Sequence, residues 1–202
     1  MVATAEMRAL EDRKGAMNVP IGAQVYCGNE PCGRSTHVIL NLVTNKVTHV
    51  VVEQNGALPV YRVVPIEWLE ASTAHQLVLC CSRAELAKTR PLEMESTSCD
   101  VAGTALRRAH VSPPELAVGQ GAWVEAWDGY VGLVDEFLID PRTCCVTHVI
   151  LHEAHLWGHI AIAVPVSAVS RIEENRVHLA LNLDSVQDLP AVPMPSTSAR
   201  GH

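Results

Sequence analysis

Aromatic residues are scarce in this chain, with four Trp, three Tyr and a single Phe among 202 residues. A core built with so few of them has to be filled by aliphatic side chains, of which valine is the most frequent. β-branched side chains lose χ1 freedom in helices and pack well on pleated strands. The composition therefore favours an all-β fold and disfavours a helical bundle.

Positive charge and long apolar runs are also in short supply. The chain has 15 basic against 22 acidic residues, a formal net charge of −7, whereas nucleic-acid binding needs a basic face. We therefore expect no general nucleic-acid binding. No apolar run approaches the ~20 residues of a membrane-spanning helix, and the polar N-terminal segment is unlike a signal peptide. Seven cysteines without such a signal are typical of cytoplasmic thiols, so a cytoplasmic location is expected.

Motifs of nucleophilic and phosphate chemistry are missing as well. The sequence contains neither Gly-x-Ser-x-Gly nor a phosphate-binding loop. Asp128 and Asp140 are better explained as turn formers than as paired catalytic carboxylates. We therefore expect no enzyme activity and no cofactor.

What the sequence does contain is an internal repeat. The tetrapeptide VTHV at residues 47–50 recurs at residues 146–149, an offset of 99. After one inserted residue the offset becomes 100, and Val-Pro at residues 64–65 matches Val-Pro at residues 164–165. Chance does not keep one register over this length with a single one-residue shift. We infer a tandem duplication that yields two domains of similar fold.

Within the second repeat, short apolar stretches alternate with turn signals. Turns are predicted at Asp128-Gly129 and at residues 140–143, and Pro165 ends a strand because proline cannot donate to a ladder. One helical turn is predicted at residues 166–169. Strands are predicted at residues 122–126, 131–139, 146–152, 160–164 and 177–181. Five short strands with turns every ~8–12 residues are typical of a small barrel or sandwich.

The repeats divide the chain into five predicted segments. These are an N-terminal tail (1–19), repeat one (20–89), a linker (90–116), repeat two (117–190) and a C-terminal tail (191–202). The linker lacks strand periodicity, and a short helix is predicted at residues 102–109. The Pro- and Ser-rich C-terminal tail is expected to be disordered.

The second repeat resembles the PRC-barrel family. The resemblance rests on GAWVEAWDGYVGLVDEFLIDP at residues 121–141, VTHVIL at 146–151, LWG at 156–158 and IAVP at 162–165. Repeat one is a more divergent match. The family is named after the cytoplasmic part of the photosynthetic reaction-centre H subunit, and it includes the C-terminal domain of the ribosome-maturation factor RimM and many stand-alone bacterial proteins. The resemblance implies two small SH3-like β-barrels in tandem that dock to protein partners without catalysis.

Two places depart from the family pattern. Cys144-Cys145 stand where the family usually has Gly, before the Val-Thr-His strand. Asn29-Glu30 stand where repeat two has Asp-Gly, so a different turn type is expected there. The match is to the barrel module, and neither named function transfers with it.

Four of the ten histidines fall close together in sequence: His148, His152, His155 and His159. On a strand, His148 and His152 would share one face with Val146 and Ile150, and the other two follow in the next turn. Because imidazoles bind Zn²⁺ and similar ions, a metal site is one interpretation. The alternative is a strand histidine satisfied by hydrogen bonds, since only His148 has a counterpart, His49, in repeat one.

The cysteines allow a similar pair of interpretations. Cys27 and Cys32 flank a predicted hairpin turn, so a redox or metal role is one interpretation. The alternative is that they are small buried hydrophobes, as are Cys80-Cys81 and Cys144-Cys145. Zinc ribbons need two Cys-x2-Cys knuckles, and the sequence has none.

Three of the four tryptophans, Trp123, Trp127 and Trp157, lie in repeat two. Trp is enriched at interface hot spots, and it also fills cores, so both roles stay open. The sequence favours a non-enzymatic scaffold or adaptor with protein partners, compatible with a homo-oligomer. The alternatives are a metal- or redox-responsive sensor and, less favoured because of the acidic balance, ribosome-maturation-type binding.

Overall fold

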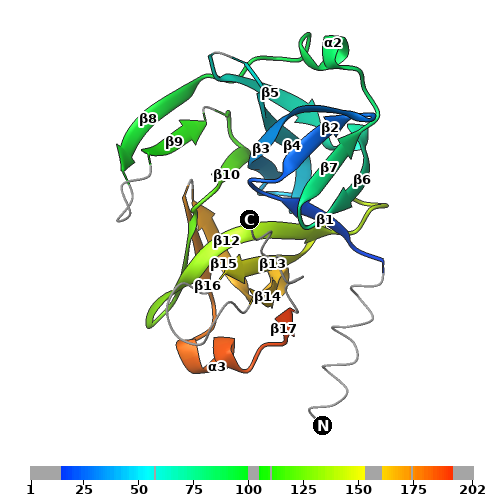
Figure 1. The fold of residues 1–202 in the computed structure, drawn as a ribbon. Coiled ribbons are helices and arrows are strands. Elements are labelled where there is room, and N and C mark those ends of the chain that lie inside the picture. The colour runs from blue at the N-terminus through cyan, green and yellow to red at the C-terminus, as the bar shows by residue number, and fades with distance from the viewer. Residues whose placement is uncertain are drawn as a thin grey trace, which may run out of the picture.

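The fold is built almost entirely of strands, which confirms the all-β prediction. The computed structural model describes residues 15–56, 58–99, 105–109, 111–152, 161–173 and 175–192. The strands form two large sheets, one in each half of the molecule, and a separate hairpin (Figure 1). No helix in the described ranges is long and apolar enough to cross a membrane.

The first sheet has seven strands in the order β5-β4-β3-β2-β7-β6, and β10 adds to β3. The strands are β2 (Gln24–Cys27), β3 (Glu30–Asn41), β4 (Lys46–Gln54), β5 (Val60–Pro65), β6 (Leu69–Thr73), β7 (Gln76–Leu79) and β10 (Glu115–Gly119). A 3-10 turn, η1 (Ile66–Trp68), joins β5 to β6, and the short helix α2 (Arg83–Leu86) follows β7. The Ser82 and Glu85 side chains form a capping box at the start of α2.

The second sheet has eight strands in the order β15-β16-β11-β12-β13-β14-β17, and β1 adds to β12. The strands are β1 (Met17–Pro20), β11 (Trp123–Ala126), β12 (Gly129–Ile139), β13 (Val146–His152), β14 (Ala161–Pro165), β15 (Val169–Glu173), β16 (Arg176–Leu179) and β17 (Ala191–Val192). The 3-10 turn η2 (Val166–Ala168) confirms the helical turn predicted after Pro165, and α3 (Leu183–Gln187) follows β16. Neither sheet closes on itself by hydrogen bonding.

The two sheets share their irregularities as well as their strand order, which supports the inferred duplication. Each sheet carries four β-bulges, where one strand has an extra residue. The extra residues are Cys32, Thr36, Thr48 and Glu70 in the first sheet and Val131, Asp135, Thr147 and Ser170 in the second. Each pair differs by the offset of 99 or 100 that relates the sequences. Bulges re-aim side chains and fix register, so the duplicated halves have kept the same register throughout.

The segments before the two repeats are exchanged between the halves. Strand β1, which precedes repeat one, pairs with β12 of the second sheet, with Val19 opposite Phe137. Strand β10, which precedes repeat two, pairs with β3 of the first sheet, with Val118 opposite Val38. Each half therefore completes its sheet with a strand from the other half (Figure 1).

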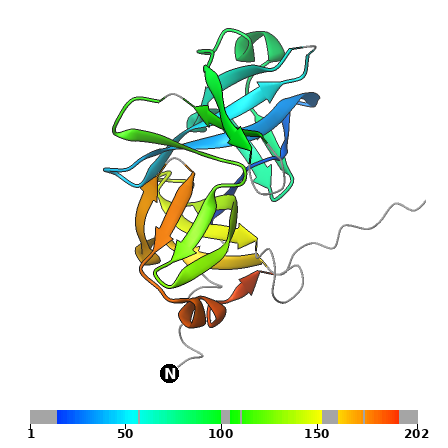
Figure 2. The same ribbon diagram turned by 90° about the vertical axis from the view of Figure 1, so that its left-hand side faces the viewer.

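The structure corrects three of the predicted segments. The predicted tail 1–19 contributes residues 17–19 to a sheet, and residues 191–192 of the predicted C-terminal tail form β17. The predicted linker 90–116 contains β8 (Met94–Cys99) and β9 (Ala105–Ala109), a hairpin beside the first sheet (Figure 2). The helix predicted at residues 102–109 is wrong for the described residues 105–109, which form β9, because cross-strand pairing with β8 overrides the weak local preference, and residues 102–104 lie outside the described ranges.

Equivalent residues meet where the halves join. Lys46 forms a β-bridge with Cys145, its own counterpart in the other repeat. The Val47 N–H donates to the Cys144 carbonyl, and the Val146 N–H donates to the Asn45 carbonyl, both at 2.9 Å. Such reciprocal contacts are those of a two-fold symmetric interface. The halves are thus arranged like the subunits of a symmetric dimer joined in one chain.

One apolar core runs through both halves. Val19, Val25, Val118 and Val124 are all completely buried in it, and so is the sole phenylalanine, Phe137. Apart from Phe137 its buried members are aliphatic side chains and cysteines, as the shortage of aromatic residues predicts. The two halves therefore share their main core, and each sheet has in addition a smaller buried cluster of its own.

The turn before the Val-Thr-His strand has a residue with left-handed backbone in both halves. Cys144 has φ = 58°, and its counterpart Asn45 has φ = 53°, the left-handed region that glycine and asparagine tolerate best. Residues 140–143 form the predicted turn, in which the Arg142 N–H donates to Asp140 Oδ1 at 2.8 Å. This bond lowers the pKa of the Asp140 carboxyl. Asp140 thus acts as a turn former.

Candidate functional site

An aromatic patch stands on the β11–β12 hairpin of the second half. Trp127 is 73% exposed and Tyr130 is 41% exposed. The Trp123 and Tyr130 rings meet edge to face with their centroids 5.4 Å apart. We call Trp123, Trp127 and Tyr130 the aromatic patch. It contains two of the three tryptophans predicted for partner binding, while Trp157 lies outside the described residues.

The hairpin that carries the patch is tied to the segment around α3. The Trp127 N–H donates to the Leu181 carbonyl at 3.1 Å, and the Leu183 N–H donates to Asp128 Oδ1 at 2.9 Å. The two-residue connection is Trp127-Asp128, one position earlier than the predicted Asp128-Gly129 turn, because Ala126 pairs with Gly129. These hydrogen bonds fix the tip of the hairpin in the position that leaves the Trp127 side chain exposed.

Charged side chains surround the patch. Arg176 donates to Glu125 Oε1 at 3.0 Å, and its guanidinium lies 5.8 Å from the Trp123 ring centroid. His178 lies 3.6 Å from Glu125 and 3.5 Å from Glu173. Burial raises the pKa of the Tyr130 phenol, so its hydroxyl remains a neutral donor around pH 7. The patch is apolar at its centre and polar at its edge, as interfaces are.

The predicted histidine cluster is only partly within the described residues. His148 and His152 lie on β13 and share the face of Ile150, as predicted. Val146 does not share that face, because the bulge at Thr147 turns it into the common core. His155 and His159 lie outside the described ranges.

No group of three or more His, Cys, Asp or Glu side chains among the described residues is arranged to hold a metal ion. The buried ring of His148 has its Nδ1 3.2 Å from Thr147 Oγ1. A hydrogen-bonded strand histidine therefore accounts for His148, and the four-histidine metal site stays a prediction.

Three thiols gather at one end of the first sheet. Cys27 and Cys32 are brought together, and the Cys27 thiol is within hydrogen-bonding reach of both Cys32 and Cys81. All three are buried and unbridged. Burial raises the pKa of Cys27 and of Cys81 from 9.0 to about 12. Protonated thiols are poor nucleophiles, so the raised pKa values predict slow alkylation of these groups at neutral pH.

The raised pKa values predict alkaline destabilisation. A thiol with a pKa near 9 when unfolded and about 12 when folded favours the folded chain below pH 9, and this stability is lost as the pH rises from 9 to 12. We expect the free energy of unfolding, measured in urea, to fall less steeply over this range in Cys27→Ala/Cys81→Ala than in the parent. Cys80→Ala, at an exposed thiol, is the control. An unchanged slope in the double variant contradicts the assignment.

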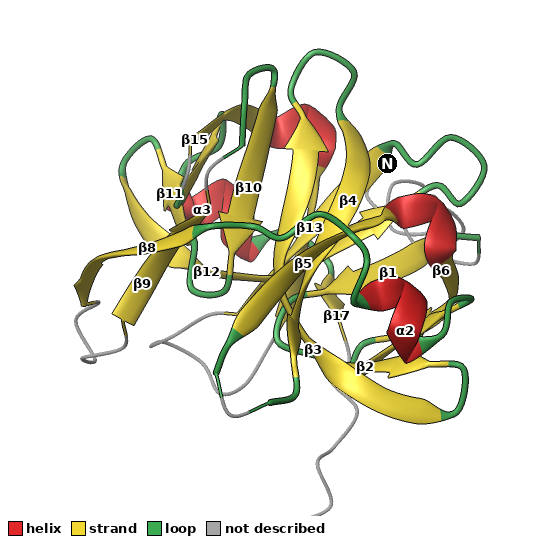
Figure 3. Cartoon of the chain, turned by 90° about the horizontal axis from the view of Figure 1, so that it is seen from above, coloured by secondary structure: helices red, strands yellow, loops and turns green. Residues whose placement is uncertain are grey.

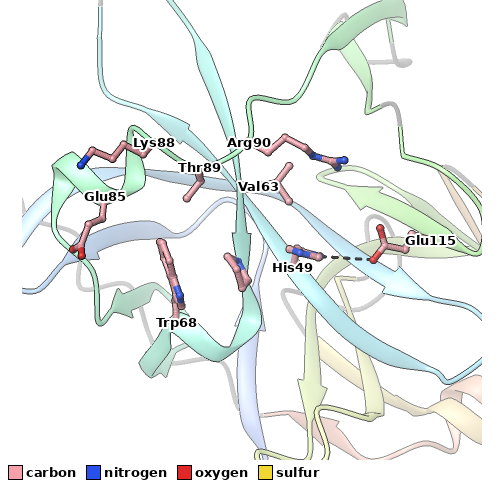
Figure 4. A pocket seen from close by; sticks show the side chains of 9 residues that line it. His49, Val63, Trp68, Glu85, Lys88, Thr89, Arg90 and Glu115 are labelled. Atoms are coloured by element: carbon pink, nitrogen blue, oxygen red, sulfur yellow. Dashed lines mark ion pairs between the residues drawn. The ribbon is translucent and has the colours of Figure 1, made fainter.

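A pocket that the sequence did not reveal opens on the first half. Its volume is about 640 Å³. The lining residues are His49, Val63, Pro65, Trp68, Glu85, Lys88, Thr89, Arg90 and Glu115. Figure 4 shows Trp68 and Glu85 on one side and His49 and Glu115 on the other. Viewed from above (Figure 3), β4, β5 and α2 lie near one another across this region.

A short polar chain fixes His49 at the edge of this pocket. Thr48 Oγ1 donates to Glu115 Oε1 at 2.8 Å, and its oxygen lies 3.0 Å from His49 Nδ1. Glu115 Oε1 is also 3.7 Å from Nδ1. We assign the Nδ1 hydrogen to this network, which leaves Nε2 as the nitrogen that a ligand would meet.

The sequence contained one signal for this site, the repeated Thr-His pair. The second half keeps the Thr147–His148 contact, and the residue equivalent to Glu115 there is Ala16. Glu115 comes from β10, inside the segment predicted as a linker without strands. Its position beside His49 depends on the strand exchange, and no local pattern predicts it.

No protein-family model and no curated protein matches the chain.

Proposed function

We propose that this protein is a non-enzymatic scaffold or adaptor that docks to a protein partner through the aromatic patch on its second half. The observation that carries the proposal is Trp127, 73% exposed at the tip of a hairpin held by main-chain contacts. Large exposed aromatic side chains on a rigid frame are typical of interface anchors. The resemblance of the repeats to SH3-like PRC-type barrels, a family of docking modules, supports the same function.

The surroundings of the patch favour a partner of particular chemistry. Glu125, Asp128 and Glu173 lie around it, and the whole chain carries a net charge of −7. A partner that presents an apolar side chain flanked by Lys or Arg would bury Trp127 and place its cations against these carboxylates. Cations also stack favourably on exposed Trp and Tyr rings. We therefore propose a protein segment with an apolar centre and a basic edge.

The proposal predicts a selective loss of partner binding in Trp127→Ala. Truncating an interface hot spot costs about 2 kcal/mol or more, roughly 30-fold in affinity, whereas an exposed side chain contributes little to folding. The full chain and the variant are used in affinity purification from native extract. The partner recovered only with the parent is then purified, and its affinity is measured by calorimetry.

Leu58→Ala is the matched control, because Leu58 is a similarly exposed hydrophobic residue, 77%, on the first half. Equal loss of binding in both variants, or undiminished binding in Trp127→Ala, contradicts the proposal. Binding that requires ribosomal subunits and weakens steeply with salt would instead support ribosome-maturation-type binding.

A metal- or redox-responsive sensor is the second candidate, and its redox form is favoured by the proximity of the Cys27 and Cys32 thiols. Elemental analysis and thiol titration of the purified full chain distinguish it from a scaffold. Stoichiometric zinc, or loss of folding on chelation, would replace the scaffold with a metal-dependent protein. A reversible Cys27–Cys32 disulfide would support the redox form.

A further inference from the structure

We propose that the pocket between β4, β5, η1, the segment after α2 and β10 binds a small planar organic anion, such as an aromatic carboxylate. Its volume, about 640 Å³, lies within the range of ligand pockets, ~300–1,000 Å³. The proposal is independent of the aromatic patch, which lies on the other half of the molecule.

The planar part of the ligand is matched by Trp68 and the apolar lining. Proline at position 65 ends β5, and the chain turns through η1 to place Trp68 at the wall of the pocket. The Trp68 carbonyl accepts a hydrogen bond from the Cys80 N–H at 2.9 Å, which holds this turn. Val63 and Pro65 add apolar surface. A flat ring is the shape that stacks against an indole and a proline.

The negative charge of the ligand is matched by the two cations of the lining. Both carboxylates of the lining are engaged within the protein. Glu85 accepts from the N–H and hydroxyl of Ser82 at 2.8 and 2.7 Å, which lowers the pKa of the Glu85 carboxyl. Glu115 accepts from Thr48. Lys88 acts on the Glu85 carboxylate through its charge, without a hydrogen bond. The Arg90 side chain forms no hydrogen bond or close ion pair with any residue that the structure describes.

Arginine and lysine left open at the edge of an apolar pocket are suited to a carboxylate. His49, held by Thr48 and Glu115, adds one oriented polar contact through Nε2. The lining thus combines a ring surface, two exposed cations and one fixed imidazole.

The second half shows that the fold does not need these side chains. The frame is kept, because the Val63 N–H donates to the Arg90 carbonyl as the Ala163 N–H does to the Pro190 carbonyl. The side chains that give the pocket its chemistry are replaced at the equivalent positions: Trp68 by Ala168, Lys88 by Asp188, Arg90 by Pro190 and Glu115 by Ala16. Both halves fold alike without sharing them. Their concentration around one cavity therefore points to binding rather than to stability.

The test is calorimetric titration of the full chain with 2-naphthoate, with chemical-shift mapping of the backbone amides. We expect a Kd below ~1 mM, which a ligand of this size reaches at ordinary ligand efficiency, with shifts centred on Trp68 and Arg90. Removing the charge (2-naphthylmethanol) or the flat ring (cyclohexanecarboxylate) should each weaken binding at least tenfold.

Variants locate the site. In Lys88→Ala/Arg90→Ala we expect the affinity for 2-naphthoate to fall at least tenfold and the affinity for 2-naphthylmethanol to stay unchanged. Both side chains are exposed, so folding is preserved. Trp68→Ala introduces the residue found at the equivalent position of the second half, Ala168, and should weaken the binding of both compounds. Trp68→Phe should restore part of the affinity. Asp188→Ala, at the position equivalent to Lys88, is the control and should bind like the parent.

Three results would overturn the proposal. The first is no binding of 2-naphthoate up to 10-fold above the expected ~1 mM. The second is equal affinity for 2-naphthoate and 2-naphthylmethanol in the parent and the double variant. The third is a set of shifts centred on the aromatic patch. None of these outcomes bears on partner docking through Trp127.

Discussion

Replacing Phe137 with alanine is expected to lower the free energy of unfolding of the whole chain by about 3–5 kcal/mol. Phe137 is completely buried and is the only phenylalanine of the chain. It pairs with Val19 of β1 on one side and Val149 of β13 on the other. Because β1 belongs in sequence to the first half, a cavity at Phe137 weakens a contact that both halves need.

The measurement is urea unfolding followed in two variants that each report on one half. Trp68 alone reports on the first half when the other three tryptophans are replaced by Phe, and Trp123 alone reports on the second. We expect the two transitions to coincide in the parent and to shift together in Phe137→Ala, since the core is continuous. Val43→Ala, at a side chain 79% exposed, is the neutral control. Two separate transitions, with only Trp123 affected, would contradict a single cooperative unit.

Cooperativity of this kind follows from the strand exchange, which the sequence did not predict. The repeat offset predicted the duplication, and Pro165, Asp140 and the tetrapeptide VTHV predicted local elements that the structure bears out. Periodicity reports which face of a strand is apolar, but it does not report which half of the molecule covers that face. Strands β1 and β10 are short, and their partners lie about a hundred residues away or in the other repeat. Their pairing is settled by the shared core.

The candidate sites likewise divide into one that local sequence reveals and one that depends on long-range pairing. Trp127 was recognisable because it is one of three tryptophans concentrated in repeat two and Trp is enriched at interface hot spots. The pocket was not, because its residues come from five separate elements and the segment after α2, and Glu115 reaches His49 only through β10. Comparison of the repeats could have singled out Trp68, because the equivalent residue of the second half is Ala168. Differences between internal repeats thus mark candidate sites more sharply than the features they share.

Replacing Gly33 with alanine is expected to destabilise the chain by about 2–3 kcal/mol, because the added methyl group has no space. A Cβ atom at Gly33 would overlap the backbone oxygen of Glu53 and lie 2.8 Å from Val52 Cγ1. Backbone oxygen in a paired strand cannot move aside without breaking the β3–β4 ladder, in which Gly33 stands opposite Gln54. The equivalent residue of the second half is Gly132, beside the matching bulge.

Gly56→Ala is the matched control, because the nearest atom to its new methyl group, the Leu58 carbonyl oxygen, lies 3.5 Å away in ordinary contact. There we expect no loss, or a gain of about 0.5 kcal/mol from a less flexible unfolded chain. Urea unfolding of both variants against the parent measures the difference. Equal stability of Gly33→Ala and Gly56→Ala would mean that β3 and β4 separate easily at this point. The bulge at Cys32 argues against that, because it fixes the register of β3 on the β2 side while β4 holds the other edge. Because β3 is paired on both sides at this point, it cannot shift to make room for a methyl group, so the fold itself requires Gly33.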